Sequence, residues 1–336
     1  MAQMTKTKII SKEKPFESDK NLILKMLKFI GSNLKFLLIP GYRLEDLTLR
    51  EIEFEKNISK RRFIRRLKSV LTLIGIGIIF AIITMAVFPE WLAPYSFEEA
   101  NGLPGNSWFP PSEDYPLGQT EFGRDILSRI IFGARSSLTI ALPSITFSVV
   151  CGVIIGVVAA YYGGWIDAVI MRLVDIFLAF PGLILAMVFI AIWSPRMEYI
   201  MLAYGIIGIP FYSRLIRGSV LQSRALPYVE AAKVAGAGNW RIMFKHILPN
   251  CIQPIIISFT FNIGGIILAL AGLAFLGYSD VELIEWGRDI DIGRGQLVNA
   301  PWAAFWPGIM ILFTVLGFML LGDGLRDALD PRMRNL

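Results

Sequence analysis

Long stretches with few or no charged residues recur along this chain, and their length is the strongest constraint on its fold. A helix that crosses a bilayer needs about 20 predominantly apolar residues. The hydrocarbon core has no water to satisfy backbone groups, so such segments must be helical. The sequence therefore predicts an all-α membrane protein with six transmembrane helices, at residues 69–89, 136–166, 176–195, 199–220, 247–279 and within 295–322.

The composition agrees with a membrane protein and excludes several other classes. Hydrophobic residues make up 54% of the 336 residues and charged residues only 18%, whereas soluble domains are about 25% charged. These values exclude a disordered protein, a collagen and a disulfide scaffold. His246 is the single histidine, and Cys151 and Cys251 lack the spacing of metal ligands, so we predict no metal site.

Positive charge is concentrated at the N-terminus. Seventeen of the 33 lysines and arginines lie in residues 1–68, directly before the first apolar stretch. With six spans, 27 of the 33 fall on the same side of the membrane as this tail. Cytoplasmic loops carry the excess of basic residues, so we expect a multi-pass protein of the cell membrane with both termini in the cytoplasm. The basic tail is accordingly assigned to the membrane surface and not to nucleic acid.

These patterns predict a basic cytoplasmic tail, residues 1–67, followed by a transmembrane domain, residues 68–336. Within the tail, residues 21–39 are apolar but include three lysines. A lysine in mid-bilayer costs about 2.5–3.5 kcal/mol, so an interfacial helix is favoured here over a seventh span. Membrane lipid is therefore an expected partner of the tail.

An outer loop and an amphipathic helix are predicted between the first two spans, in residues 89–135. In residues 120–132, apolar side chains repeat every four positions, while Arg124, Asp125 and Arg129 fall on the other side. We expect this helix to lie flat on the outer surface of the membrane. An interfacial aromatic belt is predicted from four tryptophans, Trp91, Trp108, Trp286 and Trp302.

A short polar segment, residues 223–246, separates the fourth and fifth spans. Pro227 suits the first turn of a helix, and Gly236 or Gly238 supplies a left-handed stop. The helix between them is too short to span, at roughly 13 Å, and Glu230 lies where the helix dipole favours a carboxylate. Small side chains let another protein approach it closely, at Ala231, Ala232 and Ala235. The segment is either a rigid knob for a partner's socket or an ordinary loop helix.

Several motifs together give this chain a specific resemblance. Glu230-Ala-Ala-x3-Gly236 is followed by His246-Ile-Leu-Pro249, and this pattern resembles the signature of the inner-membrane permease subunits of ABC importers. Three further stretches resemble the dipeptide/oligopeptide/nickel branch of this family, and in particular its second, C-type, permease. These are residues 116–138, 300–308 and 321–331. The resemblance covers about residues 60–336.

The resemblance implies a type I ABC importer permease fold with a cytoplasmic coupling helix. It implies a homologous permease subunit as partner in a heterodimer, two cytoplasmic ATPase subunits and an extracytoplasmic substrate-binding protein. Coupling to the ATPases is expected from Tyr228, Glu230, Ala231, Ala232 and Gly236. This chain has no Gly-x4-Gly-Lys-Ser/Thr loop. We therefore expect ATP and Mg²⁺ on the ATPases, with no cofactor and no enzymatic activity on this chain.

Further candidate residues lie on either side of the coupling helix. Support of the coupling loop is assigned to Arg217, His246 and Pro249. A lining role in the pathway is assigned to Asn262, Gly264 and Gly265 of the fifth span, although close helix packing is the favoured role of the paired glycines. At the start of the third span, Arg172 and Asp175 are three residues apart. We expect them to form an anchoring ion pair, with a proton relay as the alternative.

The substrate implied by the resemblance is a di- or oligopeptide, with oligosaccharide or nickel as alternatives in the same branch. Two other classes of function remain open. A stand-alone secondary transporter or channel is disfavoured because no inverted repeat is visible in the sequence. A membrane-anchored scaffold would use the short helix only to recruit a cytoplasmic protein.

Overall fold

The structure is a computed structural model that describes residue 67 and residues 69–102 and 107–329. All of these belong to one structural unit, Phe63–Leu336. Except for Leu67, the predicted tail of residues 1–67 lies outside the described residues, and so does its interfacial helix at 21–39.

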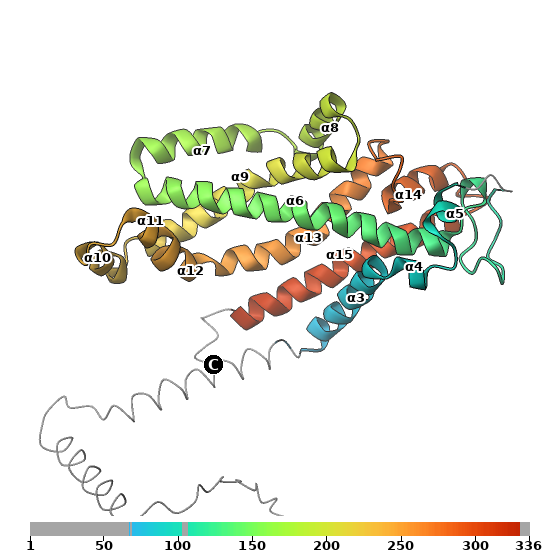
Figure 1. Cartoon of the computed structure of the whole chain (residues 1–336), viewed down its shortest axis with the longest axis horizontal. Helices are drawn as coiled ribbons and strands as arrows, with labels where there is room; N and C mark the ends of the chain where they lie inside the picture. The colour runs from blue at the N-terminus through green and yellow to red at the C-terminus, as the bar shows by residue number, and fades with distance from the viewer. Residues whose placement is uncertain (1–66, 68, 103–106, 330–336) are drawn as a thin grey trace, which may run out of the picture. The chain divides into compact units, whose positions relative to one another are not determined.

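Long apolar helices make up most of the described chain (Figure 1). Five are long and apolar enough to cross a membrane, and a bent pair brings the number to six when counted as one span. The five are α3 (Val70–Val87), α6 (Ile126–Tyr162), α9 (Met197–Ser223), α13 (Gln253–Phe275) and α15 (Trp302–Leu329). The bent pair is α7 (Gly164–Leu178) and α8 (Gly182–Trp193). Within the described residues, the predicted all-α membrane fold is confirmed, with six spans when the bent pair counts as one.

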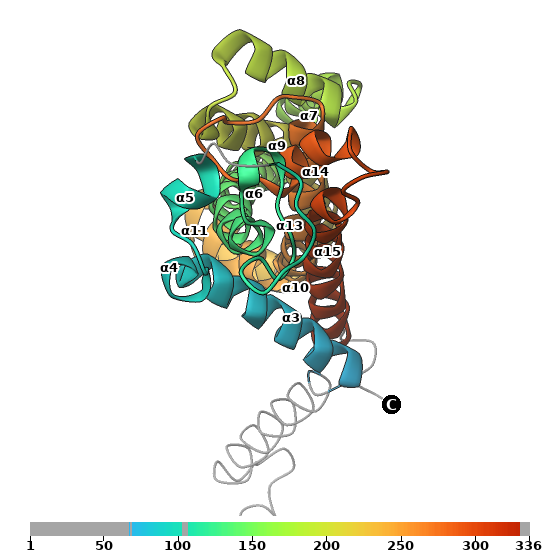
Figure 2. The same cartoon turned by 90° about the vertical axis from the view of Figure 1, so that its right-hand side faces the viewer.

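Short helices gather at the two ends of this bundle (Figure 1). One group comprises α10 (Pro227–Val234), α11 (Asn239–Arg241), the π-helical η2 (Ile242–Ile247) and α12 (Leu248–Cys251). The other comprises α4 (Pro89–Leu92), α5 (Phe97–Gly102), the 3-10 helix η1 (Glu121–Gly123) and α14 (Trp286–Arg294). We call these the α10 end and the α14 end. Figure 2 looks along the bundle, with α7 and α8 on one side and α3 on the opposite side.

Local signals in the sequence account for where the long helices begin and end. The side chain of Ser69 caps α3 by accepting a hydrogen bond from the Thr72 N–H (3.3 Å). Asp125 caps α6 in the same way, accepting from the Ser128 N–H at 2.7 Å. Both caps satisfy a backbone donor that has no partner within the helix. Gly163 ends α6 with a φ of 68°, a left-handed conformation that favours glycine.

The amphipathic helix predicted for residues 120–132 is not a separate surface helix. Its second half is the beginning of α6, which runs unbroken for 37 residues. Ile126, Ser128 and Arg129 are all buried there, so this part of the helix is enclosed on its polar side as well. The prediction is wrong because the polar side chains are satisfied inside the protein, Asp125 as a helix cap and Arg129 in an ion pair with a distant carboxylate.

The third predicted span, residues 176–195, is not one straight helix. It is divided between the last residues of α7 and the whole of α8, which meet at an angle of 85°. Pro181 follows the break; its ring removes a backbone donor and disfavours helical geometry at Phe180. Because α7 already begins at Gly164, the apolar segment starts earlier than predicted and bends in its middle.

Close helix contact in the middle of the bundle depends on residues without bulky side chains. A methyl group at Gly156 of α6 would overlap the backbone of Ser213 on α9. Ser148 of α6 donates a hydrogen bond to the Gly205 carbonyl of α9 at 2.7 Å. Small residues and interhelical hydrogen bonds hold helices together where lipid removes the hydrophobic drive for association. This packing fixes α6 and α9 as the frame on which both ends are built.

Candidate functional site

The short helix predicted between the fourth and fifth spans is present as α10. Pro227 occupies its first position, and Val229 is its one buried residue. At its C-terminus, the Gly236 N–H donates to the Lys233 carbonyl (2.9 Å) and the Ala237 N–H to the Ala232 carbonyl (3.0 Å). This pair of bonds is the Schellman arrangement, and Gly236 has the φ of 78° that it requires.

Most of the predicted coupling residues lie on the exposed surface of α10. Tyr228, Glu230, Ala231 and Gly236 are exposed, whereas Ala232 is half-buried on the side of the bundle. At the end of the helix, Val234 has 89% of its surface exposed, an unusual position for an apolar side chain. The free face of α10 is therefore small, apolar in part and fixed by its two ends.

Side chains from neighbouring elements hold the base of α10. The hydroxyl of Tyr161, at the end of α6, donates to Asn239 Oδ1 at 2.9 Å. Lys233 Nζ lies 6.0 Å from the centre of the Tyr161 ring. Beyond α10, the Trp240 and Phe244 rings pack with their centres 4.3 Å apart. The two contacts of Tyr161 tie the segment to the end of α6.

A π-helical turn follows, and Pro249 explains its position. The Leu248 N–H donates to the Met243 carbonyl, five residues earlier. Proline cannot donate and its ring crowds the preceding turn, so the wider turn accommodates it. His246 lies in this turn, half-buried, and its backbone carbonyl accepts a hydrogen bond from Asn250 Nδ2 at 2.8 Å. The structure thus places His246 and Pro249 directly between α10 and the fifth span.

Two arginines of α9 form ion pairs with α7 near the α10 end. Arg217 binds Asp167 through two hydrogen bonds of 2.6 Å each, a bidentate arrangement. Arg214 pairs with Asp175 at 2.5 Å. The predicted pairing of Asp175 with Arg172 on the same helix is therefore wrong, because the long guanidinium side chain of α9 reaches across to the carboxylate instead.

The predicted pathway residues of α13 divide between two faces. A cavity of about 310 Å³ lies between α6, α9 and α13, and Asn262 and Gly265 line it. Asn262 Nδ2 donates to the Tyr212 hydroxyl in this cavity at 2.9 Å. Gly264 instead faces α15, where an added methyl group would touch Val315. Gly264 therefore packs closely against α15, whereas Gly265 and Asn262 line the cavity.

The α14 end contains a buried cluster that the sequence analysis did not identify. Arg129 and Asp289 form an ion pair at 2.6 Å with both side chains only 2% exposed. The Trp286 side chain is also buried, and its Nε1 donates to the Ile130 carbonyl at 3.0 Å. Trp286 was predicted to lie in an interfacial belt, and that prediction is wrong. Since its partners lie more than 150 residues away, no local pattern revealed this burial.

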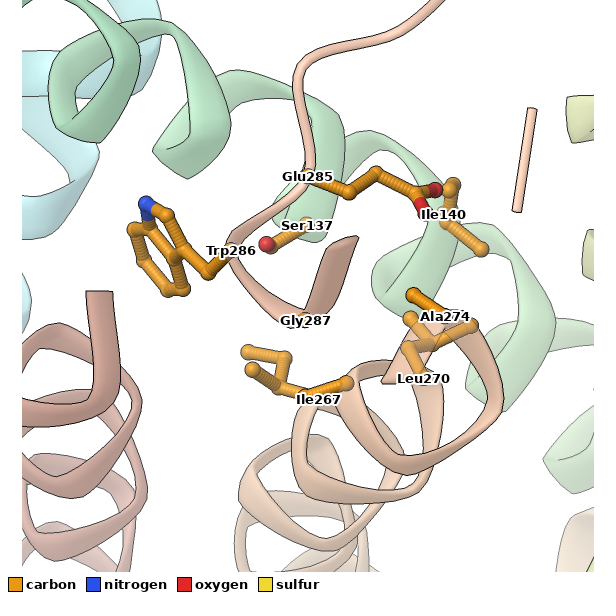
Figure 3. Close-up of a pocket in the computed structure, with 9 residues that line it drawn as sticks. Ser137, Ile140, Ile267, Leu270, Ala274, Glu285, Trp286 and Gly287 are labelled. Carbon is orange, nitrogen blue, oxygen red and sulfur yellow. The ribbon is translucent and has the colours of Figure 1, made fainter. Parts of the chain in front are cut away.

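A narrow pocket adjoins this cluster where the chain enters α14 (Figure 3). Glu285, Trp286 and Gly287 approach α6 and α13 here, with the Trp286 ring and the Glu285 side chain extending in different directions. Gly287 lies so close to α13 that a methyl group would overlap the backbone of Ala271. The remaining lining residues are Ser137, Ile140, Ile267, Leu270 and Ala274.

Comparison with known proteins identifies the family of this chain. Residues 152–335 match the family described as "Binding-protein-dependent transport system inner membrane component". The chain belongs to this family. It is an inner-membrane permease subunit of an ABC importer, and it has the type I ABC permease fold that the motifs predicted.

Individual relatives cover most of the permease. The dipeptide transport system permease protein DppC of Alkalihalophilus pseudofirmus is 41% identical over 269 residues, which cover 80% of this chain and 88% of that protein. The glutathione transport system permease protein GsiD of Pectobacterium atrosepticum is 39% identical over 276 residues, covering 82% and 90%. The di/tripeptide transport system permease protein DppC of Pseudomonas aeruginosa is 40% identical over 266 residues, covering 78% and 88%.

Proposed function

We propose that this permease forms half of the translocation pathway of a peptide importer and couples it to ATP hydrolysis through α10. The observation that carries the coupling role is α10 itself, a helix with one buried anchor, Val229, and an otherwise free surface. Both termini and the α10 end lie in the cytoplasm in this proposal, in agreement with the excess of basic residues on that side.

A knob of this shape is suited to a socket on another protein. Its exposed alanine and glycine positions allow a partner's backbone to approach, and Val234 offers apolar surface to a contact. Because both ends of α10 are fixed, a movement of the partner would displace the whole helix and would not deform it. The partners proposed at this end are two cytoplasmic ATPase subunits, which also supply the ATP and Mg²⁺ sites.

Movement of α10 would reach the pathway through the helices on which it stands. The Arg217–Asp167 pair joins α9 to α7, and the Tyr161–Asn239 bond joins α6 to the coupling segment. Closure of the ATPases would therefore move α6 and α9 relative to their counterparts in a homologous permease subunit, the proposed partner in a heterodimer. Such a rigid-body change alternates access to the pathway.

The pathway surface is proposed to include the cavity between α6, α9 and α13. Asn262 and Tyr212 supply hydrogen-bonding groups there, and Gly265 leaves open space beside them. Polar groups in the interior of a membrane bundle are costly and usually functional. An amide and a phenol suit a substrate that carries peptide groups.

A di- or oligopeptide is the proposed substrate class. The relatives described above are named for the transport of dipeptides, di/tripeptides and glutathione, all of which contain peptide bonds. Oligosaccharide and nickel remain the alternatives from the same branch. Substrate would arrive from an extracytoplasmic binding protein at the α14 end.

Copurification tests this proposal directly. The tagged permease is extracted from its native membrane in mild detergent, and the accompanying proteins are identified and quantified. We expect a second permease, ATPase subunits and a binding protein, whose bound ligand identifies the substrate class. A permease that emerges alone, under conditions that preserve other membrane complexes, would contradict the proposal.

A matched pair of substitutions locates the ATPase contact. Glu230→Lys reverses an exposed charge on α10, and Glu282→Lys makes the same change at an exposed position of the α14 end. We expect Glu230→Lys to lose ATPase subunits from the purified complex and Glu282→Lys to retain them. Equal recovery in the two variants would place the ATPase contact elsewhere.

A further inference from the structure

Glu285 is a carboxylate in unusual surroundings. It precedes α14 and has only 9% of its surface exposed. Figure 3 shows its side chain extending between α6 and α13 toward Ile140, with Leu270 and Ala274 beneath it. Apart from Ser137, the side chains that α6 and α13 contribute to the pocket are apolar.

Glu285 also differs from the other buried acids in having no partner. Among the described residues, its carboxylate accepts no hydrogen bond and forms no ion pair. Asp289, by contrast, binds Arg129, and Asp125 accepts hydrogen bonds from the backbone N–H and the hydroxyl of Ser128, both at 2.7 Å. An ionised carboxylate without a partner is costly to bury, and a bound proton removes that cost.

The size of the pocket limits what else could satisfy this group. The free space beside Glu285 is about 10 Å³. That is close to the minimum volume that holds one water molecule. Neither an amino acid nor a hydrated metal ion fits in a space of this size.

Burial and the charged groups around Glu285 together raise its pKa. Burial raises the pKa of Glu285 to about 8, and the negative charges of Asp280 and Asp289 add to the effect, while Arg288 opposes it. From α9, the group that faces Glu285 is Tyr204. The part of the pocket contributed by α6 and α13 is formed by Ser137 and apolar residues.

We propose that Glu285 binds a proton and that this proton holds α14 against the ends of α6 and α13. When the proton leaves, the negative charge is relieved by movement of the segment that carries Glu285 out of the pocket and into water. The α14 end would then open as the surrounding pH rises. This inference concerns the α14 end alone and does not depend on the identity of the substrate.

The direction of the pH dependence follows from linkage. The packed form holds the proton up to about pH 8, whereas a released, solvated glutamate loses it near its ordinary pKa of 4.5. The packed form therefore binds more protons throughout this interval, and its stability falls as the pH rises from about 4.5 to 8. Above about pH 8, the stability that the bound proton gives to the packed form is fully lost.

Hydrogen–deuterium exchange tests the proposal on the full-length permease in its assembled complex in lipid nanodiscs. Exchange of peptides that cover residues 284–294 is followed at pH 6.5 and pH 9 and corrected for the intrinsic rate. We expect opening to increase about thirtyfold in the native protein between these values. Glu285→Gln should remove this increase, and the exposed control Glu282→Gln should keep it. A native protein without the increase, or a Glu285→Gln variant that retains it, would overturn the proposal.

A second substitution keeps the test decisive if Glu285→Gln does not assemble. Arg288→Gln removes the cation that favours ionised Glu285, so the midpoint of the opening transition should move to higher pH. A purely structural role for Glu285 predicts no shift of the midpoint. An unchanged midpoint in Arg288→Gln would therefore also overturn the proposal.

Discussion

At the α10 end a helix of eight residues stands on one buried side chain, whereas at the α14 end a helix of nine residues is fixed by four buried residues. The free surface of α10 carries small and apolar residues together with the charged Glu230 and Lys233. The surface of α14 is inserted between α6, α13 and α15, with Trp286 and Asp289 inside. The first end leaves most of its side chains free, and the second uses its side chains to close the bundle.

The difference shows how each end tolerates change. An exposed helix can lose a side chain without leaving a cavity or an unpaired charge, so substitutions in α10 should change function more than stability. At the α14 end, Arg129 and Asp289 are both buried and are paired across 160 positions of sequence. Substitutions there should change stability first, because a removed partner leaves the other group buried.

The largest effect is expected from Asp289→Ala. The substitution leaves Arg129 charged and buried without its carboxylate, although Arg129 also donates to the Ala100 carbonyl at 2.7 Å. Breaking a buried pair in this way costs about 3–5 kcal/mol. Denaturant unfolding in detergent micelles should show this loss of unfolding free energy.

The control for this substitution is Asp291→Ala. Asp291 pairs with Arg294 on the same helix at 2.9 Å, and the Arg294 side chain is 56% exposed. Exposed pairs contribute about 0–1 kcal/mol. A similar cost for Asp289→Ala and Asp291→Ala would show that the α14 end is not locked by its buried pair.

At the α10 end, Gly236→Val should affect coupling more than stability of the bundle. Gly236 has a φ of 78°, and nothing lies within 4 Å of an added side chain. The penalty is therefore conformational, about 1–3 kcal/mol for a branched residue in the left-handed region. We expect the C-terminus of α10 to unravel and transport-coupled ATPase activity of the complex to fall about tenfold.

Gly238→Val provides a matched control for this prediction. Gly238 is equally open to solvent, but its φ of −65° suits any residue. Activity should therefore stay close to that of the native complex. If the two variants lose activity equally, side-chain bulk rather than backbone conformation is responsible, and the proposed role of the Gly236 turn is wrong.

A smaller effect is expected from Arg217→Lys. Lysine retains the charge but loses the planar fork, so one of the two bonds to Asp167 is lost. The expected cost is about 1 kcal/mol in unfolding free energy, with a partial loss of ATPase coupling. Arg214→Lys, at the more exposed pair with Asp175, should cost less than half as much. A larger loss of unfolding free energy for Arg214→Lys than for Arg217→Lys would contradict this prediction.

The two ends also differ in how far the sequence predicted them. Proline at the first position and glycine at the left-handed stop are local signals, so α10 could be located from Pro227 and the two glycines, although the sequence left open whether Gly236 or Gly238 forms the stop. The pairing of Arg129 with Asp289 joins residues 160 positions apart, and no periodicity encodes it. Because this pairing could not be predicted, we assigned the charged side of residues 120–132 to the membrane surface. In the structure, Asp125 and Arg129 on that side are buried in the protein interior.

Within the membrane helices, apolar length predicted the number of spans but not their shape. Pro181 was a local signal for the bend between α7 and α8, yet the apolar run continued through it and concealed the break. The opposite roles of Gly264 and Gly265 could not be predicted either, since neighbouring residues on a helix face different partners. Which face meets α15 and which meets the cavity depends on the assembled bundle.

The smallest effect is expected from Trp91→Ala in α4, at the same end as Trp286 but on the outside. Trp91 is 88% exposed, and its ring lies 6.2 Å from that of Phe88. Removing it leaves no cavity and no unpaired hydrogen-bonding group, so unfolding free energy in micelles should change by less than about 0.5 kcal/mol. Trp286→Phe, which removes the hydrogen bond to the Ile130 carbonyl and part of a buried ring, should cost about 1–3 kcal/mol. Equal costs for these two tryptophans would mean that burial does not determine stability at the α14 end, and the comparison between the two ends would lose its physical basis.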